Sequence, residues 1–291
     1  MSLQSALMEL VLVPLSVAAA LVALLGDRLA ALAARLAAVA RRAAAAAPPP
    51  ARRTDAASII IVNWNGRDLL ERCLPSVVEA AHHAGGRHEV IVVDNGSDDG
   101  SVGFVRQAFP AVRVLELPSN LGFGGGNNAG VRAATHDIVV LLNNDMRVDR
   151  GFLAPLLAPF NDERVFAVSA QIHMGEPEQE RVETGLTRGE LNDGSLRVWH
   201  AAVSASSVSV QPCLWAGGGS AAFDRRRFLA LGGFHPLYAP FYVEDVDLSY
   251  RAWRRGWTVL FAPGSHVYHH HRSTTGRFGH TYVERALAKN R

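Results

Sequence analysis

The chain has 291 residues, of which 48% are hydrophobic and 19% are charged, with a formal net charge of +2 at pH 7. This composition excludes an intrinsically disordered chain and provides enough apolar residues for one substantial core. The two cysteines, Cys73 and Cys213, exclude a disulfide framework and lack zinc-site spacing. The small excess of positive charge lies mostly before the first expected strand, so the rest of the chain is close to neutral. We therefore expect no nucleic-acid partner.

Residues 6–25 are apolar apart from Glu9 and Ser16, and a membrane-spanning helix needs about 20 such residues. The arginines of this region all follow the apolar run, which predicts that its C-terminal side faces the cytoplasm. We therefore expect residues 1–27 to form a transmembrane or membrane-associated helix at the cytoplasmic membrane. The alternative is a helix packed on the protein itself or on a partner. Residues 28–57 are expected to form an Ala/Arg-rich helix and a proline linker.

From residue 58 onward, strand-like and helix-like segments alternate, which predicts an α/β domain with parallel strand pairing. Strands are expected at 58–63, 89–94, 112–117, 138–142, 165–172 and 258–261. Helices are expected at 66–84, 100–109, 125–135, 151–160 and 244–255, together with one that begins at residue 224. Residues 174–210 form a polar excursion with weak periodicity. The domain is expected to span 58–275 and to be followed by a C-terminal helix at 276–291.

Polar side chains follow the first two expected strands, at Asn63, Asn65, Asp94 and Ser97. The carboxyl ends of parallel strands are where an α/β sheet binds a ligand. A carboxylate there can accept hydrogen bonds from a base or a ribose, while the start of the next helix attracts phosphate. The alternative for Asp94 is a helix cap in an ordinary turn.

A glycine-rich run follows the third expected strand and contains Asn120, Gly122 and Asn127. It lacks the position of a dinucleotide fingerprint, and no lysine completes a P-loop because Lys289 is the only lysine of the chain. We expect the backbone to approach a ligand closely here, with Asn127 donating hydrogen bonds to it. The alternative is a flexible glycine turn.

The apolar run at 138–142 ends in Asn143, Asn144 and Asp145. One carboxylate beside amide oxygens can hold Mg²⁺ or Mn²⁺ when phosphate and water complete the coordination shell. The alternative is a solvated aspartate. Histidines gather after the last expected strand, at 266 and 269–271, and at most one of the three consecutive rings is expected to reach a metal because alternate side chains of an extended loop diverge.

Glu244, Asp245 and Asp247 open an expected helix between aromatic residues. Acids in a first turn interact favourably with the helix dipole, which is one explanation of this cluster. An apolar setting can also raise a carboxyl pKa toward the range needed for proton transfer. Three acids within four residues exceed what a helix cap requires, so we favour the second explanation.

Read in order, the segments VNWNG, VVDNGSDDGS, NLGFGGGNNAG, LLNND, GGGSAAFDRR and YVEDVDLSYR resemble the family 2 glycosyltransferases, in particular the rhamnosyltransferase-like branch. The resemblance covers residues 58–275. It implies a GT-A fold, with a single mostly parallel nucleotide-binding sheet flanked by helices. The chain departs from the family where its metal motif has one acid instead of two, and where it ends within a helix that continues in relatives.

The resemblance also implies the roles of individual residues. Asp94 contacts the nucleobase, Asp145 binds a divalent metal and the diphosphate, Asp245 is the catalytic base with Glu244 beside it, and His269 contacts metal or diphosphate. The remaining nucleotide-sugar contacts are expected from Asn63, Asn65, Ser97, Asn120, Gly122, Asn127 and Asn144. The acceptor side is expected to include Trp215, Gly218 and Asp247.

The implied activity is inverting transfer of a rhamnose-like or other hexose from a nucleoside-diphosphate sugar to a glycan or lipid-linked glycan. Such a reaction belongs to cell-envelope polysaccharide synthesis and would place the catalytic domain on the cytoplasmic side of the membrane. Two other classes stay open. One is a nucleotidyltransferase that makes nucleotide sugars, although its basic glycine-rich loop is missing from the first strand. The other is a non-catalytic, membrane-anchored sugar-binding module.

Overall fold

The computed structural model describes residues 51–85, 87–174, 184–204, 208–269 and 280–290. The expected helix at 1–27, the Ala/Arg-rich helix after it, and His270 and His271 lie outside these residues. Within the described ranges, no helix combines the length and the apolar character that a bilayer crossing requires.

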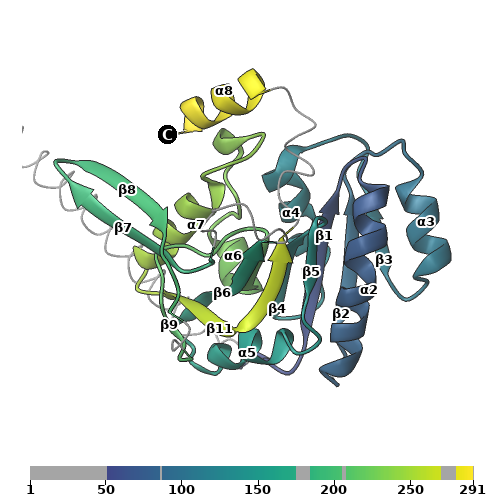
Figure 1. Cartoon of the computed structure of the whole chain (residues 1–291), viewed down its shortest axis with the longest axis horizontal. Coiled ribbons are helices and arrows are strands. Elements are labelled where there is room, and N and C mark those ends of the chain that lie inside the picture. Colours follow the sequence, from purple (N-terminus) through teal and green to yellow (C-terminus); the bar gives the residue numbers. More distant parts are fainter. Residues whose placement is uncertain (1–50, 86, 175–183, 205–207, 270–279, 291) are drawn as a thin grey trace, which may run out of the picture. The chain divides into compact units, whose positions relative to one another are not determined.

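One mixed sheet, with strand order β3-β2-β1-β4-β10-β6-β11-β5, forms the centre of the domain (Figure 1). β1 (Ala57–Asn63) pairs in parallel with β2 (Glu89–Asp94) and β4 (Ile138–Asn143), and β3 (Arg113–Glu116) extends this half. The second half is formed by β6 (Val165–Met174), β10 (Ser220–Asp224), β11 (Thr258–His269), β5 (Met146–Val148) and the short β9 (Gln211–Pro212).

The expected mostly parallel sheet is only partly correct, because parallel pairing is confined to β3-β2-β1-β4 and to the pair of β6 with β11. β10 runs antiparallel to both of its neighbours, β4 and β6, and β5 and β9 run antiparallel to β11. β10 follows a loop that contacts the end of β4 directly, through a hydrogen bond from Asn143 N to Gly219 O of 2.9 Å. The chain thus enters β10 at the edge where β4 ends, and β10 must run in the opposite direction.

Helices cover both faces of this sheet. α2 (Arg67–His83), α3 (Ser101–Ala108), α5 (Leu153–Leu157) and the 3₁₀ turn η1 (Ala158–Asn161) contribute to one apolar cluster. α4 (Gly122–Ala133), α6 (Arg225–Ala230) and α7 (Glu244–Trp253) contribute to the other. The second 3₁₀ turn, η2 (Pro236–Tyr238), precedes α7, and α8 (His280–Asn290) is the last element.

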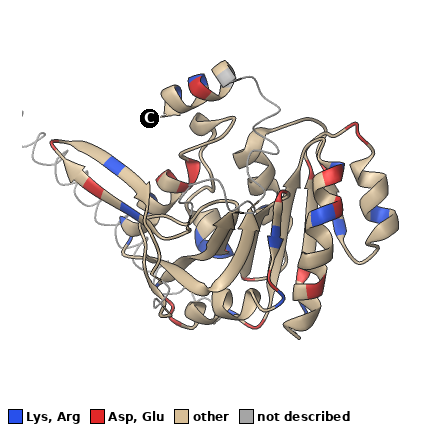
Figure 2. Ribbon diagram, in the orientation of Figure 1, with Lys and Arg blue, Asp and Glu red and all other residues tan. Residues whose placement is uncertain are grey.

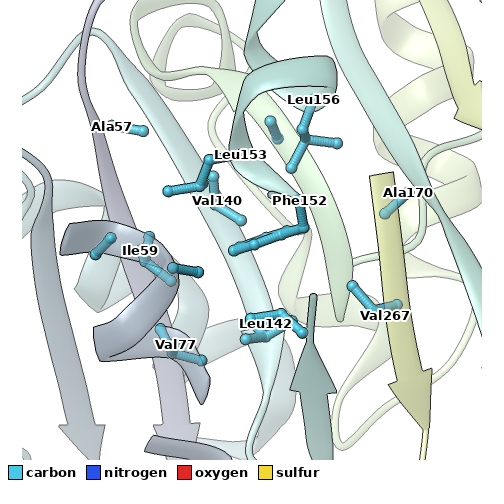
Figure 3. Packing of buried hydrophobic residues seen from close by; sticks show 14 of the residues in the cluster. Ala57, Ile59, Val77, Val140, Leu142, Phe152, Leu153, Leu156, Ala170 and Val267 are labelled. Atoms are coloured by element: carbon cyan, nitrogen blue, oxygen red, sulfur yellow. The ribbon is translucent and has the colours of Figure 1, made fainter. Parts of the chain in front are cut away.

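Successive side chains of β1 point to opposite faces of the sheet, so this strand contributes to both apolar clusters. Ile59 and Ile61 face α2 and α5, where they pack with Val140, Leu142 and residues of α5 such as Leu153 and Leu156 (Figure 3). Ile60 points to the opposite face and packs in the second apolar cluster, to which α4, α6 and α7 contribute. Both faces of the central strands are buried, as expected for strands that read as continuous apolar runs.

The outer surface of α2 carries charges of both signs (Figure 2). Arg67 Nε and Glu71 Oε1, one turn apart, are separated by 3.1 Å. Exposed pairs of this kind contribute at most about 1 kcal/mol, so they support the helix only modestly. Packing of the buried face of α2 holds the helix on the sheet.

The second half of the chain contains one element that was not expected and one strand that is longer than expected. The polar excursion contains a hairpin, β7 (Thr187–Asn192) and β8 (Ser195–His200), whose turn at Asp193 and Gly194 has positive φ angles of 49° and 78°. Asp-Gly is a strong hairpin signal in the sequence. The last strand was expected to end at residue 261, but β11 continues to His269 with a register shift between Ala262 and His266.

The globular unit begins at Arg52 and therefore includes the end of the expected linker. The Arg52 side chain is 9% exposed, and its Nη1 lies 2.7 Å from Asp224 Oδ2. The guanidinium also donates to the carbonyls of Val165, at 2.9 Å, and Asp162, at 2.8 Å. Residue 52 thus ties the segment before β1 to the start of β6 and the end of β10.

Arg52→Met should destabilise the domain by about 3 kcal/mol, because it leaves Asp224 buried without its closest cation. Arg53→Met is the matched control, since Arg53 pairs with Asp55 at a site where its side chain is 66% exposed. Urea unfolding of both variants measures the difference. Equal unfolding free energies for the two variants would show that Arg52 does not belong to the folded unit.

Candidate active site

Polar side chains at the ends of β2, β1 and β4 form one hydrogen-bonded network. Asn63 pairs in register with Asp94, and Asn144 Nδ2 donates to Asn63 Oδ1 at 2.8 Å. Asn63 Nδ2 donates to Ser101 Oγ at 3.0 Å. Because Asn63 is fully buried, it orients its neighbours and does not itself present a surface to a ligand.

The same network orients the loop after β2. Ser97 N donates to Asp94 Oδ2 at 3.0 Å, and Asn65 N donates to Ser97 Oγ at 3.0 Å. A Cβ at Gly66 would lie 2.5 Å from Asn144 Nδ2, so only glycine permits this close approach. Four of the predicted nucleotide-sugar contacts, Asn63, Asn65, Ser97 and Asn144, therefore gather around Asp94.

Asn95 connects this network to the start of α4, and the sequence interpretation missed it. Its Nδ2 donates to Asn120 Oδ1 at 3.0 Å, and its Oδ1 accepts from Leu121 N at 2.8 Å. Asn120 Oδ1 also accepts from Gly122 N at 2.8 Å. The Asn-Gly pair at 95–96 could have been recognised, because a buried asparagine after a strand must find partners for both its donor and its acceptor.

The glycine-rich run forms helix α4 instead of a loop that approaches a ligand. A Cβ at Gly126 would lie 2.7 Å from Val62 Cγ1, and one at Gly130 would lie 2.4 Å from Ile60 Cγ2. These two glycines therefore let the helix pack closely on β1. Asn127 is 2% exposed, and its Nδ2 donates to the carbonyl of Phe123 within the helix. The donation from Asn127 to a ligand stays a prediction, and one hydrogen of its amide group is engaged within α4.

Asp145 lies beside His269 because β5 pairs with β11. Met146 is in register with His269, and Asp145 Oδ1 is 3.4 Å from His269 Nε2. The side chains are 7% and 11% exposed, respectively. Cys73 is buried nearby on α2, where desolvation and the negative charge of Asp145 raise the pKa of its thiol. That thiol therefore stays protonated and is unsuited to metal binding.

The loop before β10 connects the end of β4, next to Asp145, to the acids of α7. A Cβ at Gly219 would lie 2.5 Å from the Asn143 side chain. One residue earlier, Gly218 N donates to Asp245 Oδ2 at 3.4 Å. Val246 N donates to the other oxygen of Asp245 at 2.8 Å. The expected neighbours Gly218 and Asp245 are thus in contact, and Asn143 is a further connecting residue that was not predicted.

Glu244 and Asp245 differ in their surroundings although they are adjacent. Burial, together with the charge of Asp245, raises the pKa of Glu244 to about 8. Burial also raises the pKa of Asp245, but backbone N–H donors from Val246 and Gly218 oppose this shift. Burial thus raises the pKa of both carboxyl groups, which brings them toward the range needed for proton transfer at neutral pH.

Two cavities adjoin the domain surface. Glu244 lines one of about 210 Å³, together with Gly124 of α4, Phe234 of the loop after α6 and Tyr238 of η2. The other, of about 220 Å³, is lined by residues near the start of β1, including Thr54 and His88. Only the first contains a predicted site residue.

Two expected acceptor-side residues have structural contacts. Trp215 is 6% exposed and its ring meets His200 at a centroid distance of 5.3 Å, so its face is not available for stacking on a sugar. Asp247 Oδ2 lies 2.7 Å from Arg251 Nη2. That guanidinium also donates to the carbonyl of Gly233 at 2.9 Å. Asp247 therefore orders the loop after α6.

Sequence comparisons are consistent with this arrangement. Residues 58–201 match the family described as Glycosyl transferase family 2, and residues 138–285 match Glycosyl transferase family group 2. The chain belongs to the family 2 glycosyltransferases. A relative from Mycobacterium tuberculosis, N-acetylglucosaminyl-diphospho-decaprenol L-rhamnosyltransferase, is 27% identical over 248 residues, which cover 77% of this chain and 79% of the relative. The rhamnosyltransferase-like resemblance is thereby confirmed.

Solved structures confirm a GT-A-like fold for this family 2 glycosyltransferase. GalNAc-T7 with UDP, GalNAc and Mn²⁺ matches with a TM-score of 0.61 and 21% identity, over 75% of this chain and 44% of that chain. A mannosyltransferase from Pyrobaculum calidifontis with GDP-Man and Mn²⁺ matches with a TM-score of 0.57 and 22% identity, over 84% of this chain and 63% of that chain. The chain thus spans less than two thirds of either structure.

The raised pKa of Glu244 makes stability depend on pH. Since its folded pKa of about 8 exceeds the ordinary value of 4.5, the folded state binds more protons between these values, and the free energy of unfolding falls as pH rises through that window. Glu244→Gln removes this titration. Its melting temperature relative to wild type should therefore increase between pH 5 and pH 8.5.

Glu71→Gln, on the exposed face of α2, is the control for this measurement. Its melting temperature relative to wild type should stay constant over the same pH range. If the melting temperature of Glu244→Gln relative to wild type also stayed constant over this pH range, the result would contradict a protonated, buried Glu244.

Proposed function

We propose that this glycosyltransferase transfers rhamnose from a nucleoside-diphosphate sugar to a lipid-linked N-acetylglucosamine, with inversion at the anomeric carbon. The observation that carries the site assignment is a set of three carboxylate oxygens. Asp94 Oδ1, Asp145 Oδ1 and Glu244 Oε2 are buried without a hydrogen-bond partner among the described residues. Buried polar atoms are rarely left unpaired, so such a set supports a site for a polar ligand.

The nucleotide end of the donor fits the edge formed by β1 and β2. Asp94 Oδ2 is fixed by Ser97 N, which leaves Oδ1 to accept from a base N–H. A uracil or thymine ring offers such a donor, so a uridine or thymidine diphosphate sugar suits this position. The neighbouring asparagine network is hydrogen-bonded before any ligand binds, and this preorganisation reduces the entropy cost of binding.

The diphosphate end fits the edge formed by Asp145 and His269. Asp145 Oδ1 and His269 Nε2 face one another at 3.4 Å, and a carboxylate with an imidazole suits a divalent ion such as Mn²⁺. The described residues contain no group of three or more His, Cys, Asp or Glu side chains that could hold a metal. Water and diphosphate oxygens would therefore complete the shell, as hard cations permit. A bound ion would offset the charge of the leaving diphosphate.

Asp245 is assigned as the general base. An acceptor hydroxyl forms the new bond to the anomeric carbon, Asp245 accepts its proton, and the bond between that carbon and the diphosphate oxygen breaks. The contact with Gly218 N orients one carboxylate oxygen, and the raised pKa of Asp245 brings it closer to the range of an efficient base. Glu244, which stays protonated, can donate a hydrogen bond without competing for the proton.

The substrate assignment rests on the rhamnosyltransferase relative, which covers most of both chains. The name of that relative specifies an acceptor of N-acetylglucosamine on a diphospho-decaprenol. The apolar segment at 6–25 suits such a lipid-linked acceptor, because both would be found at a membrane. The experiment is transfer of labelled rhamnose from thymidine or uridine diphosphate rhamnose to that acceptor. In a parallel incubation with a nucleoside triphosphate and rhamnose 1-phosphate, release of pyrophosphate with formation of the nucleotide sugar would indicate a nucleotidyltransferase.

Asp245→Asn should reduce transfer by a factor of about 10² or more, since an amide cannot accept the hydroxyl proton. UDP binding in the presence of Mn²⁺ should remain within about twofold of wild type, because the change is isosteric and the proposed base acts on the acceptor. Turnover and calorimetry measure the two effects separately. Wild-type turnover in this variant would refute the base assignment.

Asp145→Asn should weaken UDP binding in Mn²⁺ but change little in EDTA, because it removes the charge that would attract the ion. His269→Gln should show the same pattern with a smaller loss, since it removes a neutral ligand. Calorimetric titrations with UDP, with and without EDTA, make the comparison. If EDTA leaves UDP binding by the wild-type protein unchanged, the metal assignment is wrong.

A further inference from the structure

The C-terminal helix contacts the loop that leads into the catalytic acids. Asn290, at the end of α8, is 8% exposed. Its Nδ2 donates to the carbonyls of Tyr238 at 2.9 Å, Phe241 at 2.9 Å and Tyr242 at 3.0 Å. Lys289 Nζ donates to the carbonyl between them, that of Ala239, at 2.6 Å. Figure 1 shows α8 beside this segment, above α7.

The contacted loop, residues 238–243, has an unfavourable backbone. Tyr242 and Val243 have φ angles of 77° and 75°, which are uncommon for residues with a side chain and most unfavourable for a β-branched one. Such conformations persist only where the surrounding structure holds them. Asn290 donates to the carbonyl of Tyr242, at the centre of this strained pair, and α7 begins directly afterwards at Glu244.

The loop also borders the predicted donor and acid sites. Phe123 N, in the first turn of α4, donates to the carbonyl of Pro240 at 2.9 Å. Tyr238 and Ala239 line the cavity of about 210 Å³ that Glu244 also lines. A displacement of loop 238–243 would therefore move the start of both helices relative to one another.

We propose that Asn290 is a positioning residue that holds loop 238–243 in its left-handed conformation and thereby sets the position of Glu244 and Asp245. The two hydrogens of one amide group are shared among three carbonyls that otherwise have to find other donors, and the amide belongs to an element outside the sheet. The kinetic part of this proposal rests on the proposed glycosyl transfer, whereas its structural part does not. The role is indirect, because Asn290 contacts loop 238–243 and not the acids themselves.

The test compares three variants of the full chain. Asn290→Asp keeps the size of the side chain but replaces its donor with acceptor oxygens facing three carbonyls. Asn290→Ala removes the donor without adding charge. Arg285→Gln, on an exposed part of α8, is the control. The readouts are backbone hydrogen exchange in residues 238–247, affinity for UDP with Mn²⁺, and turnover.

Both Asn290 variants should exchange faster than wild type within residues 238–247 and retain wild-type protection in β1, β2 and β4. Turnover should fall about ten- to a hundredfold, the range expected when catalytic groups are misplaced by about 1 Å. UDP affinity should stay within about twofold of wild type, and Arg285→Gln should match wild type in every readout. Asn290→Asp should be affected more than Asn290→Ala, because it adds repulsion.

Three results would overturn the proposal. They are unchanged exchange in residues 238–247, loss of protection throughout the sheet, and equal turnover in Asn290→Ala and Arg285→Gln. If Asn290→Asp does not fold, Asn290→Ala is judged by the same readouts. If the wild-type protein transfers no sugar, the proposed function fails, but the exchange result still decides whether Asn290 holds the loop.

Discussion

The parallel register of β2, β1 and β4 is the constraint on which the site depends. Asn63 pairs with Asp94, and Val62 pairs with Asn143, so the polar residues that follow all three strands appear at one edge. A shift of one residue in either pairing would turn these side chains to the other face of the sheet. Buried alternation along β1, with Ile59 and Ile61 on one face and Ile60 on the other, prevents that shift. The hydrophobic core thereby fixes the geometry of the polar site.

The mixed half of the sheet, formed by β10, β6, β11 and β5, completes the site from segments distant in sequence. Pairing of β5 with β11 brings His269 to Asp145, and entry into β10 at the same edge brings Gly218 to Asp245. The acids of α7 then depend on a strained loop for their position. That loop contacts α4 on one side and α8 on the other, so the donor-binding half and the acid-bearing half meet through residues 238–243.

Local sequence patterns predicted the first half of the fold well, since apolar runs there are short, continuous and separated by clear turn residues. The strand Glu89–Asp94 was placed with its observed bounds. The patterns failed where tertiary contacts decide the outcome. The helix expected at 125–135 begins three residues earlier, at Gly122 of α4. Glycines disfavour a helix locally, but their absence of side chains permits packing against Ile60 and Val62. β11 continues through a bulge to His269 because β5 and β6 pair with it, which periodicity alone does not reveal.

The candidate site shows the same contrast between features that local sequence patterns reveal and features that tertiary contacts decide. Asp94, Asp145 and Asp245 were predicted because each acid follows an apolar run at an element end, where packing does not require a charge. Asn290 was missed, because an asparagine that donates to a distant carbonyl has no local signature. Asn95 was missed although the Asn-Gly pair after a strand offered a signal. Trp215 was placed on the acceptor side from its chemistry alone, whereas its burial against His200 depends on the fold.

A crystal structure of the protein with UDP and Mn²⁺ would test the central claim most directly. We expect the uracil ring to lie against Asp94, the ion to be bonded to Asp145, and the diphosphate to lie between Asp145 and the loop of Gly218 and Gly219. A nucleotide bound in the cavity beside Glu244, or near Thr54, with no contact to Asp94 and Asp145, would contradict it.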